Sequence, residues 1–299
     1  MPSSLLYLIA TLIWGSTWLA ITFQLGVVPP EMSVVYRFGL ASALLFGFAR
    51  LRGLPLRFTA KQHAFIALEG FLLFSLNYVL VYFAEVFVTS GLVAVVFSTA
   101  TLFTVFFSAI FLRTKLHGAV VFGSLVGIIG LGIIFLPELT DFALEGSRTL
   151  GFLFALLSAI SAALGNIVAA RNQRNQLPVV QTVAYGMLYG TLLTLLYALI
   201  SGTTLVFDTS VSYIVSLLYL AIFGSVISFV SYLTLLGRIG PDRSSYIAVI
   251  IPVIALVLSA FFEGLRFNSL QFFGVVLVIA GNILVVYRRQ KVAVPATAK

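Results

Sequence analysis

Residues 118–136, GAVVFGSLVGIIGLGIIFL, contain no charged side chain. A helix that crosses the hydrocarbon core of a bilayer needs about 20 apolar residues in a row. A strand of a membrane barrel would instead alternate apolar and polar residues over about 10 positions. Residues 118–136 therefore predict a membrane-spanning helix.

Stretches of the same kind fill most of the chain on either side. The ten stretches cover approximately residues 4–22, 33–50, 63–84, 91–112, 118–136, 149–170, 178–200, 211–236, 244–262 and 268–287. Of the 299 residues, 61% are hydrophobic and 9% are charged, whereas soluble domains carry roughly 25% charged residues. We expect an all-α polytopic membrane protein with ten transmembrane helices, short loops and no appended soluble domain. The first stretch lacks a preceding Lys or Arg and a cleavage pattern, so we expect it to remain as a helix.

The charged residues predict the orientation. If the termini and the even-to-odd connections share one side of the membrane, nearly all Lys and Arg residues lie on that side. These are Arg50, Arg52, Arg57, Lys61, Arg113, Lys115, Arg171, Arg174, Arg238, Arg243, Arg288, Arg289, Lys291 and Lys299, against Arg148 and Arg266 on the other side. By the positive-inside rule both termini are cytoplasmic. The net charge of +8 is thus explained by topology, and no nucleic-acid partner is expected.

The two halves of the chain resemble each other. Residues 84–136 align with 235–287 at an offset of 151, which matches Gly123 with Gly274 and Gly130 with Gly281. Because five helices per copy is an odd number, the second copy would be inverted. We expect two inverted five-helix repeats, residues 1–140 and 147–290, followed by a short cytoplasmic tail, 291–299. Inverted repeats are typical of secondary transporters, whose substrate site lies between the repeats; chance recurrence of common glycines is the alternative.

Glycines at close spacing favour tight helix packing. Gly123, Gly127 and Gly130 recur on the fifth stretch, a spacing that lets two helices approach closely. We expect this packing to lie within the ten-helix body. No dimer is inferred, a monomer is plausible, and the oligomeric state stays open.

Several kinds of chemistry have no support in the sequence. There is no phosphate-binding G-x-x-x-x-G-K-[ST] loop, no cysteine, and no His, Asp and Glu cluster with metal-ligand spacing. We therefore expect no cofactor, no metal and no enzymatic activity.

Short motifs add a family resemblance. WGS at 14–16, YRF at 36–38 leading into Ala41, and the paired glycines of the fifth and tenth stretches resemble the EamA-type branch of the drug/metabolite transporter superfamily. The resemblance implies a bacterial inner-membrane exporter of amino acids, metabolites or hydrophobic cations, with the fifth and tenth helices peripheral to a central cavity. Among its members the chain looks most like the aromatic amino acid exporters.

The sequence departs from a symmetric pattern in two places. The seventh stretch has no arginine equivalent to Arg37, and Thr101 stands where the offset of 151 places Pro252. The two repeats have therefore diverged. Pro252 inside the ninth stretch frees a backbone carbonyl, so it is a candidate gate hinge, with a static kink as the alternative.

Two ionisable side chains, Arg37 and Glu69, lie clearly within predicted spans. A charge at the bilayer centre costs roughly 2.5–3.5 kcal/mol, so neither is expected to face lipid. Arg37 is a candidate contact for a substrate carboxylate; otherwise it extends to the interface or pairs with Glu31 or Glu85. Glu69 is the candidate for proton coupling, or else a hydrogen-bonded acid near the cytoplasmic interface. Their opposite depths argue against a direct pair.

Aromatic and polar side chains form stripes on the first and third stretches. Trp14 and Trp18 lie four positions apart, and so do Tyr78 and Tyr82, with Asn77 beside them. Residues at this spacing share one helix face, and an aromatic-lined pocket with a few polar groups suits a flat apolar ligand. The alternative is an interfacial aromatic belt, which fits Trp18 and Tyr82 best.

The second half offers three further candidates for the pocket: Asn166, Tyr232 and Tyr246. Buried Asn and Tyr side chains need partners, which a hydrated cavity or a ligand supplies. The sequence therefore predicts a secondary transporter that exports aromatic or other hydrophobic amino acids, by facilitated or loosely proton-coupled transport. Transport of other metabolites, hydrophobic cations or phosphorylated compounds is the alternative, and a non-transporting membrane scaffold is a third possibility.

Overall fold

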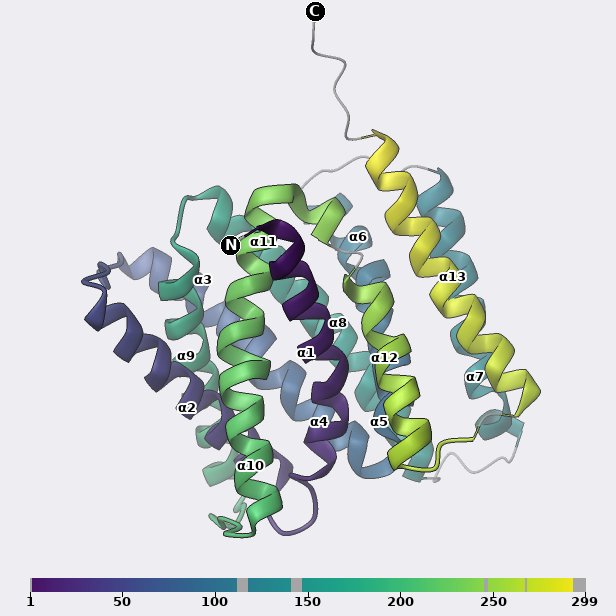
Figure 1. Ribbon diagram of the computed structural model, residues 1–299, viewed down its shortest axis with the longest axis horizontal. Coiled ribbons are helices and arrows are strands. Elements are labelled where there is room, and N and C mark those ends of the chain that lie inside the picture. Colours follow the sequence, from purple (N-terminus) through teal and green to yellow (C-terminus); the bar gives the residue numbers. More distant parts are fainter. Residues whose placement is uncertain (1, 112–117, 141–146, 245–246, 267, 293–299) are drawn as a thin grey trace, which may run out of the picture.

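The structure is a computed structural model that describes residues 2–111, 118–140, 147–244, 247–266 and 268–292. These residues form a helical bundle, and no strand occurs in the described ranges (Figure 1). The helices are α1 (Ser3–Thr22), α2 (Pro30–Leu51), α3 (Ala60–Gly70), η1 (Phe71–Leu76), α4 (Asn77–Phe87), α5 (Ser90–Ser98), α6 (Ala100–Phe111), α7 (Gly118–Thr140), α8 (Ser147–Arg174), α9 (Val179–Ile200), α10 (Val211–Tyr219), η2 (Leu220–Ile227), α11 (Ser228–Ser244), α12 (Ile247–Phe262) and α13 (Ser269–Val292).

Seven segments of the described chain are long and apolar enough to cross a membrane. They are Ser3–Thr22, Pro30–Leu51, Ala60–Phe87, Ser90–Phe111, Arg148–Arg174, Val179–Ile200 and Val211–Leu235. Three shorter apolar helices accompany them: Val121–Ile134, Ile250–Phe262 and Ser269–Leu284. The prediction of an all-helical, multi-pass membrane protein is confirmed, whereas the number of ten spans stays a prediction.

Local sequence signals set the helix ends around the first hairpin. Pro30 opens α2, where its missing N–H costs no hydrogen bond. Beyond α2, Gly53 turns the chain with a φ of +63°, a conformation that glycine adopts without steric cost. Thr59 then caps α3, because its hydroxyl accepts from the Gln62 N–H while the Gln62 side chain accepts from the Thr59 N–H. The loop between α2 and α3 is therefore short and well defined.

Two long spans contain π-helical segments at matching positions. η1 covers Phe71–Leu76 and η2 covers Leu220–Ile227. The offset of 151 carries residues 71–76 onto 222–227, within η2. A π-helical turn shifts the backbone hydrogen bonds of a helix and is frequent at functional sites.

Other helices also recur at this offset. Shifted by 151, α2 falls on residues 181–202, close to α9 (Val179–Ile200), and α7 falls on 269–291, close to α13 (Ser269–Val292). Each of these helices also packs against its counterpart, because α2 contacts α9 and α7 contacts α13. The similarity of the two halves therefore extends from glycine positions to helix bounds and helix pairing.

Glycines bring α7 and α13 into close contact at the edge of the bundle (Figure 1). A Cβ on Gly130 would lie 2.7 Å from the Gly274 carbonyl oxygen, and one on Gly281 would lie 2.6 Å from the Gly123 carbonyl oxygen and the Gly127 nitrogen. The later residue of α7, Gly130, meets the earlier residue of α13, Gly274, while the earlier Gly123 meets the later Gly281. The two helices therefore run antiparallel. The predicted packing role of these glycines is confirmed.

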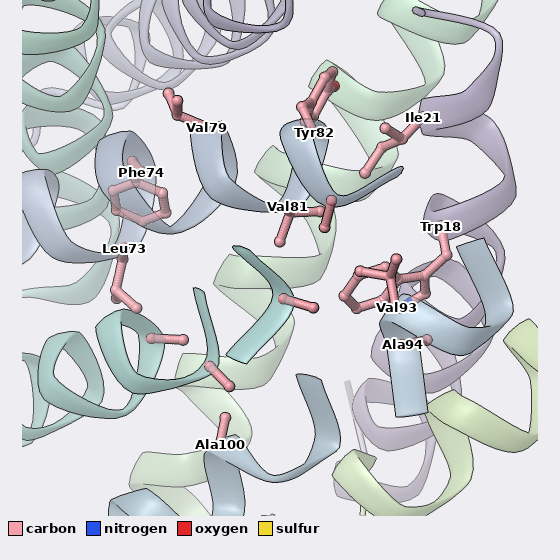
Figure 2. Close-up of a cluster of buried hydrophobic side chains, with 14 of the residues drawn as sticks. Trp18, Ile21, Leu73, Phe74, Val79, Val81, Tyr82, Val93, Ala94 and Ala100 are labelled. Carbon is pink, nitrogen blue, oxygen red and sulfur yellow. The ribbon is translucent and has the colours of Figure 1, made fainter. Parts of the chain in front are cut away.

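One large core joins both halves of the chain. It includes buried side chains of α1, α2, η1, α4 and α5 from the first half, and of α8, α9 and α11 from the second. Figure 2 shows part of this core, with Trp18 of α1 beside Val93 and Ala94 of α5, and Tyr82 of α4 farther along. Aromatic side chains of both halves meet within this core.

The close approach of α7 and α13 makes Gly281 sensitive to a single methyl group. We expect Gly281→Ala to lower the free energy of unfolding by about 1–3 kcal/mol, the usual cost of overpacking, because the new Cβ meets backbone atoms of α7. Gly132→Ala on α7 is the matched control, since a Cβ there meets nothing within 4 Å. Thermal unfolding of the purified protein in detergent, followed by circular dichroism, measures both. Equal stability of the two variants would contradict the packing.

Candidate functional site

Arg37 lies at the centre of a polar site inside the bundle. Its side chain is 0% exposed, and its Nε donates to the Ser225 hydroxyl at 3.1 Å. The guanidinium carbon stands 4.5 Å from the centre of the Tyr78 ring and 5.1 Å from that of Phe38. The Nη1 atom is buried without a hydrogen-bond partner. Arg37 therefore does not extend to the interface, and it keeps donor capacity for an anionic group.

The π-helical segment η2 makes room for this arginine. Gly224 has no side chain, and a Cβ there would lie 3.3 Å from the Arg37 Nη2 and 2.8 Å from the Thr17 methyl group. The next residue, Ser225, supplies the hydroxyl that accepts from Arg37. A charge buried among apolar groups is costly unless it is hydrogen-bonded. Gly224 and Ser225 thus provide space and a partner in consecutive positions.

Trp14 of α1 contacts the same segment. Its indole Nε1 donates to the Gly224 carbonyl oxygen at 3.1 Å. Its ring centre lies 5.0 Å from the ring centres of Phe229 and Tyr232, both on α11. Two of the predicted pocket residues, Trp14 and Tyr232, therefore lie side by side at the contact between the first and second halves.

A continuous series of ring contacts links Trp14 to Tyr78. From Trp14 it passes to Phe229 at 5.0 Å, to Phe74 at 4.9 Å, to Phe38 at 5.4 Å and to Tyr78 at 4.7 Å. These separations are typical of favourable edge-on aromatic pairs. We call these five residues the aromatic bridge. It spans α1, α11, η1, α2 and α4, and it ends under the Arg37 guanidinium.

Trp18 and Tyr82 lie deep in the bundle. Trp18 is 7% exposed and packs against Phe97 at 5.2 Å, and Tyr82 is 0% exposed. Figure 2 shows both within the hydrophobic cluster, on α1 and α4. Side chains of an interfacial belt would contact lipid and water, so the belt does not describe these two residues. The Tyr82 hydroxyl is buried without a hydrogen-bond partner.

Glu69 belongs to a separate polar contact between α3 and α8. Its Oε2 accepts from the Asn172 Nδ2 at 2.7 Å, and the Asn172 Oδ1 accepts from the Arg171 Nη1 at 3.0 Å. The Arg171 guanidinium lies over the Phe65 ring. Glu69 is 1% exposed, so Asn172 supplies the hydrogen bond that its burial requires.

The remaining predicted residues lie in different places. Asn77 donates from its Nδ2 to the Leu73 carbonyl at 3.2 Å, and its Oδ1 is buried without a partner. Asn166 is half-buried on α8, and Pro252 is buried within α12. Tyr246 lies outside the described residues.

No sequence pattern singles out several of the residues that complete these contacts. Phe38, Phe74 and Phe229 connect the predicted aromatics, Gly224 accommodates Arg37, and Asn172 binds Glu69. Phenylalanine occurs 28 times in the chain, so no spacing distinguished these three. Within the described residues, no group of three or more His, Cys, Asp or Glu side chains is placed to hold a metal ion.

A multi-pass helical bundle with a buried arginine site between its halves has the features of a membrane transporter. The EamA-like transporter family matches this chain twice, over residues 1–136 and 149–287. The chain therefore belongs to the EamA-like transporter family.

Named relatives cover nearly the whole chain. "Uncharacterized inner membrane transporter YedA" of Escherichia coli K12 is 32% identical over 287 residues, covering 91% of this chain and 89% of its own. "Probable amino-acid metabolite efflux pump" of the same organism is 26% identical and covers 94% of each chain. "Protein PagO" of Salmonella typhimurium is 25% identical and covers 99% and 95%.

A solved crystal structure has the same fold. It superposes with a TM-score of 0.68 at 18% identity, over 98% of this chain and 99% of its own length. The arrangement of helices described above is therefore shared with a protein of distant sequence.

The contact between Glu69 and Asn172 predicts a pattern of stability changes. We expect Asn172→Ala to lower the free energy of unfolding by about 1–3 kcal/mol, since it leaves a buried carboxylate without its donor. Glu69→Gln retains an oxygen that can accept from Asn172, so its effect is expected to be smaller. Adding Glu69→Gln to Asn172→Ala should restore part of the loss. Additive losses in the double variant, measured by thermal unfolding in detergent, would contradict the pair.

Proposed function

We propose that this chain is an inner-membrane exporter of aromatic and other hydrophobic amino acids and related small metabolites. One observation carries the proposal: Arg37 is buried over Tyr78 at the end of the aromatic bridge, with its Nη1 unpartnered. A guanidinium donates well to a carboxylate, while aromatic rings favour a flat apolar side chain. The carboxylate of an aromatic amino acid would thus contact the guanidinium, and its ring would contact the aromatic bridge. The E. coli relative named "Probable amino-acid metabolite efflux pump" supports this substrate class.

We infer that the transporter consists of ten transmembrane helices in two inverted five-helix repeats, residues 1–140 and 147–290, with the tail 291–299 cytoplasmic. Matching helix bounds and matching π-helical segments support this organisation. The glycine contacts support it as well. The offset of 151 converts the contact of Gly130 with Gly274 into that of Gly281 with Gly123, as a two-fold axis between antiparallel helices requires.

This organisation has a mechanistic consequence. Inverted repeats allow alternating access, in which one repeat rocks against the other around a substrate site between them. The aromatic bridge contacts both halves, so such a motion would rearrange it. Pro252 of α12 is the candidate hinge for the motion. The excess of Lys and Arg on one side supports cytoplasmic termini.

Substrate flux tests the proposed function. In proteoliposomes without an ion gradient, we expect saturable flux of labelled tryptophan and phenylalanine that unlabelled aromatic amino acids compete away. Trp14→Ala and Tyr78→Ala should reduce this flux at least about tenfold, since each removes a ring of the aromatic bridge. Tyr197→Ala is the matched control because its ring is 50% exposed on α9.

The same assay with a pH gradient examines coupling through Glu69. Facilitated transport predicts that Glu69→Gln leaves the flux unchanged with and without the gradient. Loose proton coupling predicts gradient-driven accumulation that Glu69→Gln abolishes. Absence of aromatic amino acid flux under both conditions would overturn the assignment and direct the search to hydrophobic cations, phosphorylated compounds and other metabolites, or to a non-transporting role.

A further inference from the structure

Glu85 is a buried carboxylate for which the structure provides no donor. It lies in the last turn of α4, is 7% exposed, and both of its carboxylate oxygens are buried without a hydrogen-bond partner. An ionised carboxylate that is buried without a partner is strongly unfavourable. Its position adds to the cost, since the C-terminal end of a helix carries partial negative charge.

The other buried acids of the described chain have partners. Glu69 accepts from Asn172 at 2.7 Å, and Glu31 accepts from the Thr203 hydroxyl at 2.6 Å. The half-buried Glu263, which follows α12, accepts from the Ser90 N–H at 3.1 Å and from the Ser90 hydroxyl. That position also favours an anion, because Ser90 opens α5 and the N-terminal end of a helix carries partial positive charge.

Charged groups of both signs lie near Glu85. Glu263 and Arg37 both lie within electrostatic range of Glu85, as does the Tyr82 hydroxyl. α1 and α5, which pack against α4, carry no charged side chain. Within the described residues, neither carboxylate oxygen of Glu85 has a hydrogen-bond donor.

Glu85 is connected to the arginine site by one face of α4. Tyr78, Tyr82 and Glu85 follow each other at positions i, i+4 and i+7, and residues at this spacing share one side of a helix. Arg37 lies over the first residue of this stripe, and Glu85 is its last. A zwitterionic ligand along the stripe would meet a guanidinium at one end and a carboxyl group at the other.

We propose that Glu85 is the group that accepts the ammonium of a transported amino acid, and that it holds a proton while the ammonium is absent. When the ammonium arrives, the carboxyl proton leaves to water and the carboxylate pairs with the ligand's positive charge. This inference rests on the proposed function for its substrate class. The proton on Glu85 is argued from the burial of both carboxylate oxygens without a donor, so it does not depend on the substrate.

Binding of three related compounds tests the ammonium contact. Tryptophan and tryptamine carry an ammonium group, and indole-3-propionate has the same ring without one. We expect Glu85→Gln to weaken equilibrium binding of the first two at least about tenfold, the loss typical of one charge-assisted hydrogen bond, and to leave indole-3-propionate unaffected. Glu31→Gln is the matched control. Equal effects on all three compounds, or no effect on any, would overturn the contact.

Infrared spectroscopy tests the proton without any substrate. We expect the purified protein to show a protonated-carboxyl C=O band that disappears in Glu85→Gln and persists in Glu31→Gln. A wild-type spectrum identical to that of Glu85→Gln across the acidic to neutral range would refute the protonated carboxyl. If none of the three compounds binds the wild-type protein, the substrate assignment fails, and the infrared result still decides the state of Glu85.

Discussion

The burial of the Arg37 charge is the constraint on which the central part of the structure depends. A fully enclosed guanidinium needs space, hydrogen-bond acceptors and polarisable neighbours. Gly224 supplies the space, Ser225 the acceptor and Tyr78 the aromatic face. Two of these three lie in a π-helical segment, and the Gly224 carbonyl of that segment also accepts from Trp14. The π-helical segment η2 therefore contacts both Arg37 and Trp14.

The two halves of the chain have similar helix arrangements but place different polar side chains in the site. Helix bounds, π-helical segments and glycine contacts recur at an offset of 151. At the same offset Arg37 corresponds to Leu188, and Ser225 corresponds to Phe74. Arg37 and Ser225 thus form their hydrogen bond across the halves, while neither has a polar counterpart. The polar contact that joins the two halves is therefore made once and is not repeated at the equivalent positions.

The helices could be predicted from the sequence, whereas most side-chain contacts of the candidate site could not. Continuous apolar stretches predicted the helices, because bilayer thickness fixes their length. Glycine spacing predicted close packing of α7 within the bundle, and the structure identifies α13 as the partner. Residue type alone identifies Arg37, Trp14 and Tyr232 as candidate site residues. It does not identify their partners, since Gly224 lies 210 positions from Trp14 and tertiary packing alone brings them together. The π-helical segments had no sequence signal, and the lack of a donor at Glu85 depends on the packing of neighbouring helices.

The most direct test of the central claim, that the Arg37 site lies on a route open in turn to each side of the membrane, uses the absence of cysteine from the chain. A Thr17→Cys variant carries one thiol beside Gly224 and the guanidinium, and it leaves the Ser225 acceptor in place. Membrane-impermeant maleimide, applied from each side of oriented proteoliposomes in separate experiments, should label this thiol from both sides, and tryptophan should slow the labelling. Labelling from one side alone, or a rate that tryptophan does not change, would contradict the account.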